Sequence, residues 1–281
     1  MSKSPALLRR LVGVTAVLGL LGAAPLLALQ GGAGAATPAV KIGVSIAGTS
    51  HSSISQATKM FPNAKVGRYF AQSITPYTQS SIRFFPASME IWISWNTPAS
   101  QVASGAFDAT FAKVLQSWNA SGRTIKWSWT HEADNPRQHQ NAAQIRAGWA
   151  HLLAVEKKYP NSRVKSMSIY EAYLLNSNHP HGDPNSWYVP ADVLGFDTYL
   201  LPNEARVIAY AKSKGKPWAI PETGKDQGDA NDAAFMKSMV AGWRAYPPLG
   251  VAWFSSPNGG SFSEPLNHLP KTLAYLRSIA G

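Results

Sequence analysis

Residues 124–132 (TIKWSWTHE) form an apolar, β-rich run that ends on a histidine and a glutamate. Residues 217–224 (PWAIPETG) repeat this arrangement, with a second glutamate near the end. Short continuous apolar runs are typical of strands that are buried on both faces, as in parallel sheets. Each segment therefore predicts a buried parallel strand that carries a carboxylate, Glu132 or Glu222, at its C-terminal tip.

Working outward from these two segments, similar runs alternate with amphipathic helical patterns along the chain. In the helix predicted at residues 107–119, the apolar positions follow the spacing of one helix face, and Gly122 ends the pattern. The predicted strands are residues 40–47, 65–71, 89–95, 124–130, 164–170, 193–199, 217–221 and 250–255. The other predicted helices are residues 141–158, 203–214, 230–246 and 269–279.

Eight strands with intervening helices over this length predict an α/β fold, a (β/α)8 TIM barrel. The alternative is an open, doubly wound parallel sheet. We favour the barrel because no glycine-rich phosphate loop follows the first strand. The sequence contains no linker, repeat or low-complexity tract, so we predict one catalytic domain at residues 37–281.

Residues 1–36 are predicted to be a secretory signal peptide rather than part of the barrel. Three cations precede an apolar stretch at residues 11–29, and the small residues 31–36 follow it. A membrane anchor is the alternative, because the stretch approaches the length of a membrane span. Pro25 interrupts the stretch and small residues follow it at once, which favours a cleaved signal. We therefore expect a secreted, extracellular protein with no stable membrane insertion after cleavage.

Composition restricts the partners of the chain. The formal net charge of +11 falls to +8 without the three leader cations, and the remaining basic residues are scattered. Without a basic run or a nucleic-acid motif, we do not expect binding to nucleic acid. The sequence has no cysteine, and a domain of this size can bury enough core without disulfides. The ten tryptophans and ten tyrosines offer surfaces on which sugars could stack, although most aromatic residues lie in protein cores.

Polar, ionisable and aromatic residues recur at the predicted C-terminal strand ends, where barrel active sites lie. Two carboxyls that flank a sugar are the minimal machinery of glycoside hydrolysis, and retaining enzymes hold them about 5–5.5 Å apart. Strands four and seven lie across a barrel from each other, so their tips can face one cleft. The candidate catalytic residues are Glu132 and Glu222. The candidate substrate-binding residues are His131, Tyr199, Trp253, Arg68, Trp95, Asp197 and Glu171.

The two principal glutamates require opposite protonation states. A general acid must keep its proton, which apolar surroundings or a nearby negative charge would favour for Glu132. A nucleophile must stay ionised, which Arg68 or the hydroxyl of Tyr199 could support at Glu222. The sequence therefore predicts Glu132 as acid/base and Glu222 as nucleophile.

The other candidates have weaker or divided interpretations. Glu171 is a weaker competitor for a catalytic role, and His131 is more readily an orienting hydrogen-bond donor than a base. Trp253 and Trp95 are interpreted as sugar-binding platforms, with core packing as the alternative. Asp197 is interpreted as a substrate contact or a structural cap.

Metal and nucleophile motifs of other enzyme classes are weak or missing. Residues 179–183 (HPHGD) contain metal-ligand types, but the proline and glycine favour an irregular loop, and no fourth ligand is evident. The G-x-S-x-G motif of serine hydrolases does not occur, which disfavours an esterase barrel. We therefore predict no metal site and no cofactor, and we expect a monomer.

These motifs together resemble glycoside hydrolase family 26 and its relatives in clan A, which are retaining barrels. Those enzymes carry the acid/base on strand four and the nucleophile on strand seven. Most clan members place asparagine before the acid/base, whereas family 26 places histidine there, as in His131-Glu132. Residues 195–199 (GFDTY) are similar to the strand-six motif, whose tyrosine contacts the nucleophile. Residues 216–224 are similar to the strand-seven motif, and Trp253 matches the aromatic residue of strand eight.

Two departures from the family pattern lie beside the acid/base. Ser128 stands where the family often has arginine, and residues 133–137 (ADNPR) replace a segment with glycine and tryptophan. The resemblance implies a retaining endo-β-glycanase that acts on β-mannan, with mixed-linkage β-glucan or xylan as the next candidates. The departures leave open a non-catalytic carbohydrate-binding barrel for cell-wall or glycan attachment. An unrelated barrel, such as a lyase, is a third hypothesis.

Overall fold

The computed structural model describes residues 40–46, 50–74, 78–135, 141–180, 182–225, 227–243, 246–256 and 264–280. The predicted signal peptide at residues 1–36 lies outside this described part of the chain. Within the described part, no helix combines the length and the apolar composition that crossing a bilayer requires.

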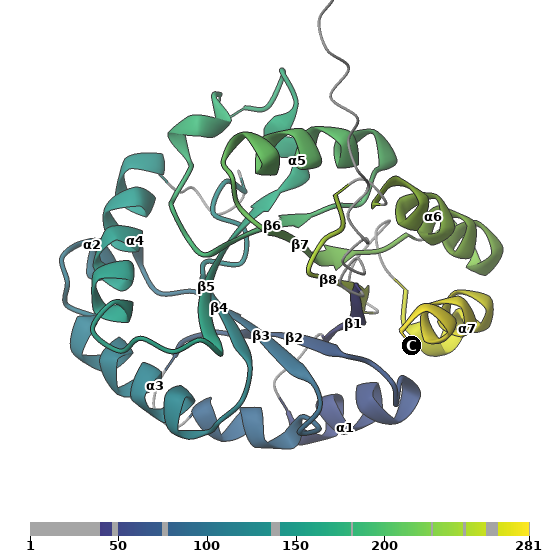
Figure 1. The fold of residues 1–281 in the computed structure, drawn as a ribbon, viewed down its shortest axis with the longest axis horizontal. Coiled ribbons are helices and arrows are strands. Elements are labelled where there is room, and N and C mark those ends of the chain that lie inside the picture. Colours follow the sequence, from purple (N-terminus) through teal and green to yellow (C-terminus); the bar gives the residue numbers. More distant parts are fainter. Residues whose placement is uncertain are drawn as a thin grey trace, which may run out of the picture. The chain divides into compact units, whose positions relative to one another are not determined.

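Eight parallel strands form a closed barrel in which each strand pairs with its neighbour in sequence and β8 pairs with β1 (Figure 1). This closure confirms the predicted (β/α)8 barrel and excludes the open doubly wound sheet. All eight strands occur at the predicted places, with small differences at their ends. They are β1 Lys41–Ile46, β2 Val66–Ala71, β3 Glu90–Trp95, β4 Ile125–Trp129, β5 Val164–Glu171, β6 Val193–Asp197, β7 Trp218–Thr223 and β8 Gly250–Ser255.

Helices surround the strands in an outer ring (Figure 1). The α-helices are α1 His51–Met60, α2 Ala99–Ala103, α3 Asp108–Ala120, α4 Ala142–Glu156, α5 Leu201–Ser213, α6 Asp229–Gly242 and α7 Pro270–Ile279. Short 3-10 helices are η1 Thr78–Phe84, η3 Ala172–Leu175, η4 Pro184–Ser186 and η7 Leu266–His268. The sequence predicted α3 to α7 but not α1 or α2.

Helix α1 was missed because its sequence is mostly polar and carries little helical periodicity. Only Ile54 and Ala57 of its ten residues are buried. Its start is instead fixed by Ser50, whose hydroxyl accepts a hydrogen bond of 3.1 Å from the backbone N–H of Ser53.

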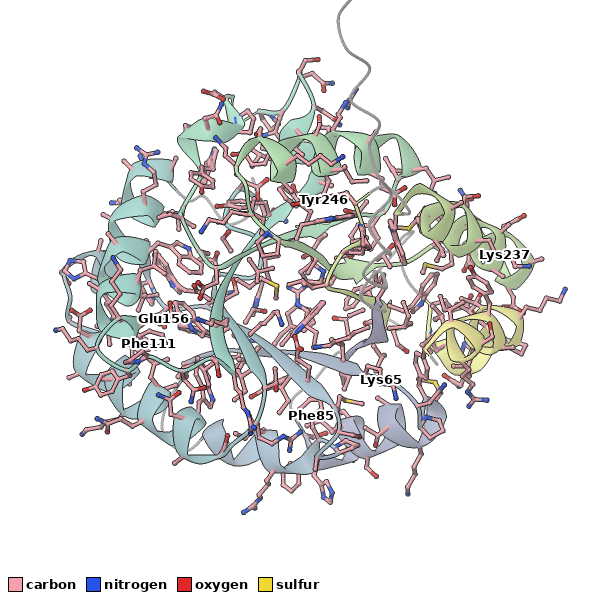
Figure 2. All side chains as sticks on the ribbon, in the orientation of Figure 1. Lys65, Phe85, Phe111, Glu156, Lys237 and Tyr246 are labelled. Atoms are coloured by element: carbon pink, nitrogen blue, oxygen red, sulfur yellow. The ribbon has the colours of Figure 1, made fainter. Side chains whose placement is uncertain are left out.

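Two apolar layers hold the barrel together, because successive side chains of a strand face opposite sides. The inner layer fills the barrel with residues such as Trp92, Ile169 and Ala252. The outer layer lies between strands and helices, and Phe111 of α3 belongs to it (Figure 2). There Phe111 packs at 4.8 Å from Trp127, which stacks at 5.2 Å on Trp149 of α4.

The end of β4 turns the chain toward the barrel rim through an unusual backbone conformation. Thr130 directly follows the strand and has φ = 71°, in the left-handed region that β-branched residues rarely adopt. Its N–H donates to the carbonyl of Trp95 at 2.8 Å, which ties this turn to the end of β3. The turn carries His131 and Glu132 out of the strand.

Strand β7 keeps its glutamate within the strand. Glu222 lies inside β7, and its carbonyl accepts a 2.8 Å hydrogen bond from the N–H of Thr198 after β6. The pairing of β7 with β8 shifts register between Ile220 and Thr223, which marks a bulge at this tip. Both carboxylate-bearing tips therefore deviate from regular strand geometry.

The N-terminal end of the barrel contains a buried ion cluster. Glu90, at the start of β3, pairs with Lys126 of β4 and Lys41 of β1 and accepts a 2.7 Å hydrogen bond from the indole N–H of Trp92. Burial alone would raise the pKa of Glu90, but these donors outweigh burial, so its pKa is lowered. Glu90 is thus held ionised far from the rim that carries Glu132 and Glu222.

Candidate active site

Glu222 is held by a cationic donor and a hydroxyl donor that come from two other strands. The guanidinium of Arg68 on β2 lies 2.7 Å from one carboxylate oxygen. The hydroxyl of Tyr199, just after β6, donates to the other oxygen at 2.7 Å. The predicted contact between Tyr199 and Glu222 is therefore present. Both oxygens of the Glu222 carboxyl therefore contact strong hydrogen-bond donors, and one of these donors is a cation.

Arg68 connects Glu222 with other residues of the site. Its Nη1 also donates to both oxygens of Asp197 on β6, at 2.9 and 3.1 Å, and its Nη2 reaches the carbonyl of His131 at 3.4 Å. Burial would lower the pKa of Arg68, but the carboxylates of Asp197 and Glu222 more than reverse this, so its pKa is raised. Arg68 therefore remains a cation that links β2, β6, β7 and the turn after β4.

The predicted substrate contacts of Arg68 and Asp197 do not fit this arrangement. Both side chains are fully buried, so neither presents a surface to a sugar. Arg68 instead contacts the nucleophile candidate, and Asp197 holds Arg68 in place. Arg68 therefore provides the positive charge beside Glu222, and Asp197 positions Arg68.

Glu132 lies in the opposite electrostatic situation. Burial, the negative charge of Glu222 and the negative charge of Glu171 raise the pKa of Glu132 to about 8. One of its oxygens accepts a 2.8 Å hydrogen bond from the amide of Asn135. Glu132 therefore carries its proton at neutral pH, as a general acid must. Glu132 is therefore the candidate acid of the pair, and Glu222, which contacts Arg68 and Tyr199, is the candidate nucleophile.

His131 lies beside the acid as a neutral, oriented ring. Burial and the charge of Arg68 lower the pKa of His131 to about 3. Its Nδ1 lies 2.7 Å from the hydroxyl of Ser94 on β3, and its ring meets that of Phe70 edge-on at 5.0 Å. The ring is only partly buried, so the predicted orienting role of His131 agrees with its placement.

The predicted sugar platforms Trp95 and Trp253 are wrong for a geometric reason. Both side chains are 0% exposed and belong to the layer between strands and helices. On β8, Ala252 faces the barrel interior, so alternation turns Trp253 outward. Trp95 packs against Phe111 at 5.7 Å. Neither indole is placed to contact a sugar.

Two phenylalanines that the sequence reading did not select have partly exposed rings near this site. Phe70 of β2 and Phe254 of β8 meet edge-on at 6.1 Å, and Arg68 lies over the Phe70 ring at 4.6 Å. Counting the alternation on β8 from Ala252 would have favoured Phe254 over Trp253. Together with His131, these rings form an apolar surface close to Glu222.

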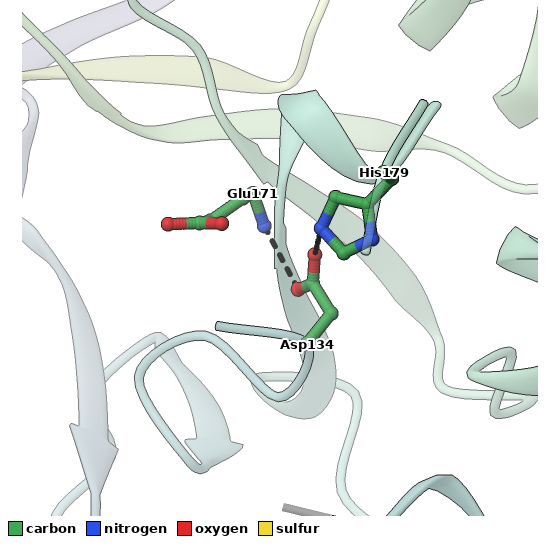
Figure 3. Close-up of side chains that lie close together, drawn as sticks. All are labelled: Asp134, Glu171 and His179. Atoms are coloured by element: carbon green, nitrogen blue, oxygen red, sulfur yellow. Dashed lines mark hydrogen bonds and ion pairs between the residues drawn. The ribbon is translucent and has the colours of Figure 1, made fainter. Parts of the chain in front are cut away.

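Asp134, Glu171 and His179 form a cluster behind Glu132 that sequence reasoning did not assemble (Figure 3). One oxygen of Asp134 accepts a 3.0 Å hydrogen bond from the backbone N–H of Glu171, and the other lies 3.6 Å from His179 Nε2. Their possible ligand atoms lie within 4.8 Å of one another. However, the carboxylate of Glu171 points away from the Asp134–His179 pair and accepts from Asn135 at 2.9 Å. The arrangement fits a hydrogen-bonded support better than a metal site.

Residues 179–183 contain metal-ligand types, but His181 lies outside the described residues. Asp183 instead caps a short helix, since its side chain accepts from the N–H of Asn185.

Comparison with known proteins identifies the fold of the chain. No family model matches the sequence, and no curated protein matches it. Among solved structures, a modular endo-beta-1,4-mannanase of glycoside hydrolase family 26 from Cellulomonas fimi is similar at 14% identity. The match has a TM-score of 0.58 and covers 86% of this chain and 70% of that one.

Two GH5_18 proteins are also similar to this chain in structure. One, from Streptomyces cattleya in complex with Manb1-4GlcNAc, has 10% identity, a TM-score of 0.63, and coverage of 85% and 80% of the two chains. The other, from Bifidobacterium longum subsp. infantis, has 12% identity, a TM-score of 0.61, and coverage of 86% and 78%. The chain therefore shares the (β/α)8 barrel fold of family 26 mannanases and GH5_18 proteins.

Proposed function

We propose that this protein is a retaining endo-β-glycanase, with Glu222 as nucleophile and Glu132 as acid/base. One observation carries the proposal. Glu222 accepts from Arg68 and Tyr199 through both oxygens, whereas burial and neighbouring negative charges keep Glu132 protonated. Two carboxyls at one barrel rim, one protonated and the other held by a guanidinium and a hydroxyl, suit double displacement at a sugar.

In the first step, an oxygen of Glu222 attacks the anomeric carbon and the bond from that carbon to the leaving oxygen breaks. Glu132 gives its proton to that leaving oxygen, so the departing sugar leaves as an alcohol and Glu132 becomes a carboxylate. The Asn135 amide already donates to this carboxyl and stabilises the new charge. The product of this step is a glycosyl ester of Glu222.

In the second step, water attacks the same carbon and the ester bond to Glu222 breaks. Glu132 accepts the proton of the water, which restores its starting state. Arg68 and Tyr199 stabilise the released carboxylate of Glu222. Two inversions at one carbon give net retention of configuration.

β-Mannan is the first proposed substrate, with mixed-linkage β-glucan or xylan next. The similar solved structures support this choice, since they include a family 26 endo-beta-1,4-mannanase and a GH5_18 protein that holds Manb1-4GlcNAc. We also propose that residues 1–36 direct export, so that the enzyme acts on extracellular polysaccharide.

Reducing-sugar release from mannan, glucomannan, xylan, curdlan and mixed-linkage glucan tests the proposal. We expect release from one polymer by the wild type and a loss of at least about 1,000-fold in kcat for Glu222→Ala, because the variant lacks the carboxylate that forms the ester. Asp108→Ala, which removes a carboxylate from outer helix α3, is the matched control and should retain activity.

Chemical rescue separates the roles of the two glutamates on an aryl β-glycoside with a good leaving group. With Glu222→Ala, azide should replace the nucleophile and give the α-glycosyl azide. With Glu132→Ala, the leaving group needs no proton, so azide should give the β-glycosyl azide. The opposite pairing of products would reverse the assignment. A folded wild type that binds a polymer but releases no sugar would favour the non-catalytic binding barrel.

A further inference from the structure

Asn135 joins two carboxyls that come from different strand ends. Its side-chain amide donates to an oxygen of Glu132 at 2.8 Å and to an oxygen of Glu171, the last residue of β5, at 2.9 Å. An amide NH2 group has two hydrogens, so it can serve both acceptors at once. The orientation of the Glu132 carboxyl is thereby linked to the position of Glu171.

Further contacts hold the backbone around Glu171 in place. Asp134 accepts from the Glu171 backbone N–H at 3.0 Å, and His179 Nε2 lies 3.6 Å from the other oxygen of Asp134 (Figure 3). The side chains of Asp134 and His179 are fully buried. The N–H of Ala133 also donates to the carbonyl of Ile169 on β5 at 3.2 Å. The turn after β4 and the tip of β5 are thus joined through Ala133 and Asp134 as well as through Asn135.

Several charges face Glu132 from the surrounding elements. Glu171 is linked to Glu132 most directly, because the side-chain amide of Asn135 donates to both carboxyls. A negative charge at Glu171 opposes ionisation of Glu132, whereas the Asn135 hydrogen bond favours it. Within the described residues, the charged or titratable groups around Glu132 are Glu171 of β5, Glu222 of β7, Arg68 of β2, Asp197 of β6, Tyr199 after β6, and His131 and Asp134 of its own turn.

We infer that Asn135 and Glu171 are a positioning pair that aims the Glu132 carboxyl and sets the pH range in which it is protonated. This inference rests on the proposed function of Glu132 as acid/base. It replaces the sequence-based interpretation of Glu171 as a substrate contact. The negative charge of Glu171 favours the protonated form of Glu132 before the first step. The Asn135 amide stabilises the Glu132 carboxylate after that step. Neither residue is consumed in the reaction.

The first test is the pH profile of kcat/KM for Glu171→Gln. Glutamine keeps an oxygen that accepts from Asn135 but removes the charge, so Glu132 should lose its proton more easily. We expect the alkaline limb of the profile to move down by about one pH unit, since charges separated by one amide interact by this order near a protein surface. Glu171→Asp keeps the charge and should leave the limb near its wild-type position.

Asn135→Ala should move the same limb in the opposite direction. Loss of the donor removes a group that favours the carboxylate, so Glu132 should hold its proton to higher pH. The kcat should fall on substrates with poor leaving groups while KM changes little, because the acid is less well aimed. Opposite shifts from Asn135→Ala and Glu171→Gln form a signature that a general loss of stability would not produce.

A titration of Glu132 that does not depend on turnover separates this inference from the proposed function. Selective carbon-13 labelling of glutamate, with assignment by the Glu132→Gln variant, reports the protonation of Glu132 by NMR. If the wild type hydrolyses no glycan but the Glu132 titration still moves down in Glu171→Gln, the proposed function fails and the positioning pair stands.

Two results would overturn the inference. In the first, Glu171→Gln raises KM with an unchanged pH limb and an unchanged Glu132 titration, which would return Glu171 to substrate binding. In the second, Zn2+ raises the melting temperature of the wild type but not of His179→Ala, which would identify the cluster behind Glu171 as a metal site.

Discussion

At the residue scale, the proton on Glu132 affects the folded protein as well as the proposed reaction. In the unfolded chain this glutamate ionises near its usual value, whereas burial raises its pKa to about 8 in the fold. Between those two pH values the unfolded chain has released the proton and the folded chain retains it. The contribution of Glu132 to stability therefore falls as pH rises from about 4.5 to about 8.

Replacing Glu132 with glutamine should remove this pH-dependent loss. We expect Glu132→Gln to match the wild type in stability near pH 4.5 and to exceed it by about 1–2 kcal/mol near pH 8.5. This is less than the full shift implies, because the site opens to solvent. Thermal unfolding of both proteins across this range provides the measurement. A difference in melting temperature that is the same at all pH values would contradict the expectation.

Contacts between residues that lie in recognisable strand motifs could be predicted from the sequence, whereas contacts between loop residues could not. Tyr199 and Glu222 each follow a recognisable strand pattern, so their contact was anticipated. Asn135 and His179 lie in segments without periodicity. Their meeting with Glu171 depends on how two rim loops fold back, which no local pattern encodes.

At the element scale, α4 approaches the barrel closely through a glycine. A methyl group added at Gly148 would lie 2.4 Å from the ring of Trp129, the last residue of β4. The indole N–H of Trp129 donates to the carbonyl of Thr97 at 3.0 Å, so the ring has little freedom to move. The position of α4 therefore depends on the missing side chain.

We expect Gly148→Ala to destabilise the protein by about 1–3 kcal/mol through overpacking, although alanine favours helices by about 1 kcal/mol over glycine. Activity should fall too, because Trp129 lies directly before the turn that carries Glu132. The control is Ala150→Gly at an exposed position of the same helix, which should cost only about 1 kcal/mol by propensity. A more stable Gly148→Ala variant, measured by denaturant unfolding, would show that α4 can move away.

Strands were easier to predict than the direction of their side chains. Buried parallel strands must be apolar on both faces, so their runs stand out from the sequence. The same property hides which face is which, and Trp253 was placed on the wrong side for that reason. Only a neighbour of known direction, here Ala252, resolves the alternation.

At the scale of the whole molecule, the two ends of the barrel hold charges for different purposes. The C-terminal rim carries Glu132 and Glu222, whereas the N-terminal end buries Glu90 between two lysines. A cavity of about 500 Å³ opens at that end, lined in part by Lys41, Glu90 and Arg123. Barrel enzymes carry out their chemistry at the C-terminal face, so we assign the Glu90 cluster to stability.

Glu90→Gln should destabilise the protein by about 3 kcal/mol, because it leaves Lys126 buried without its counter-charge. The double variant Glu90→Gln/Lys126→Met should recover most of this loss. Folded protein of either variant should keep the wild-type kcat. A double-mutant cycle by denaturant unfolding measures the coupling, and additive losses would rule out a stabilising pair.

Because the barrel must close to bring the site together, recovery of the proposed activity can report the time at which the barrel forms. Arg68 lies on β2, near the start of the barrel sequence, whereas Glu222 lies on β7, near its end. A partly folded chain can form helices and fluoresce from buried tryptophan before this ion pair exists. Recovery of the proposed hydrolysis after dilution from denaturant would therefore lag behind those optical signals, and the lag would report when β2 and β7 come together.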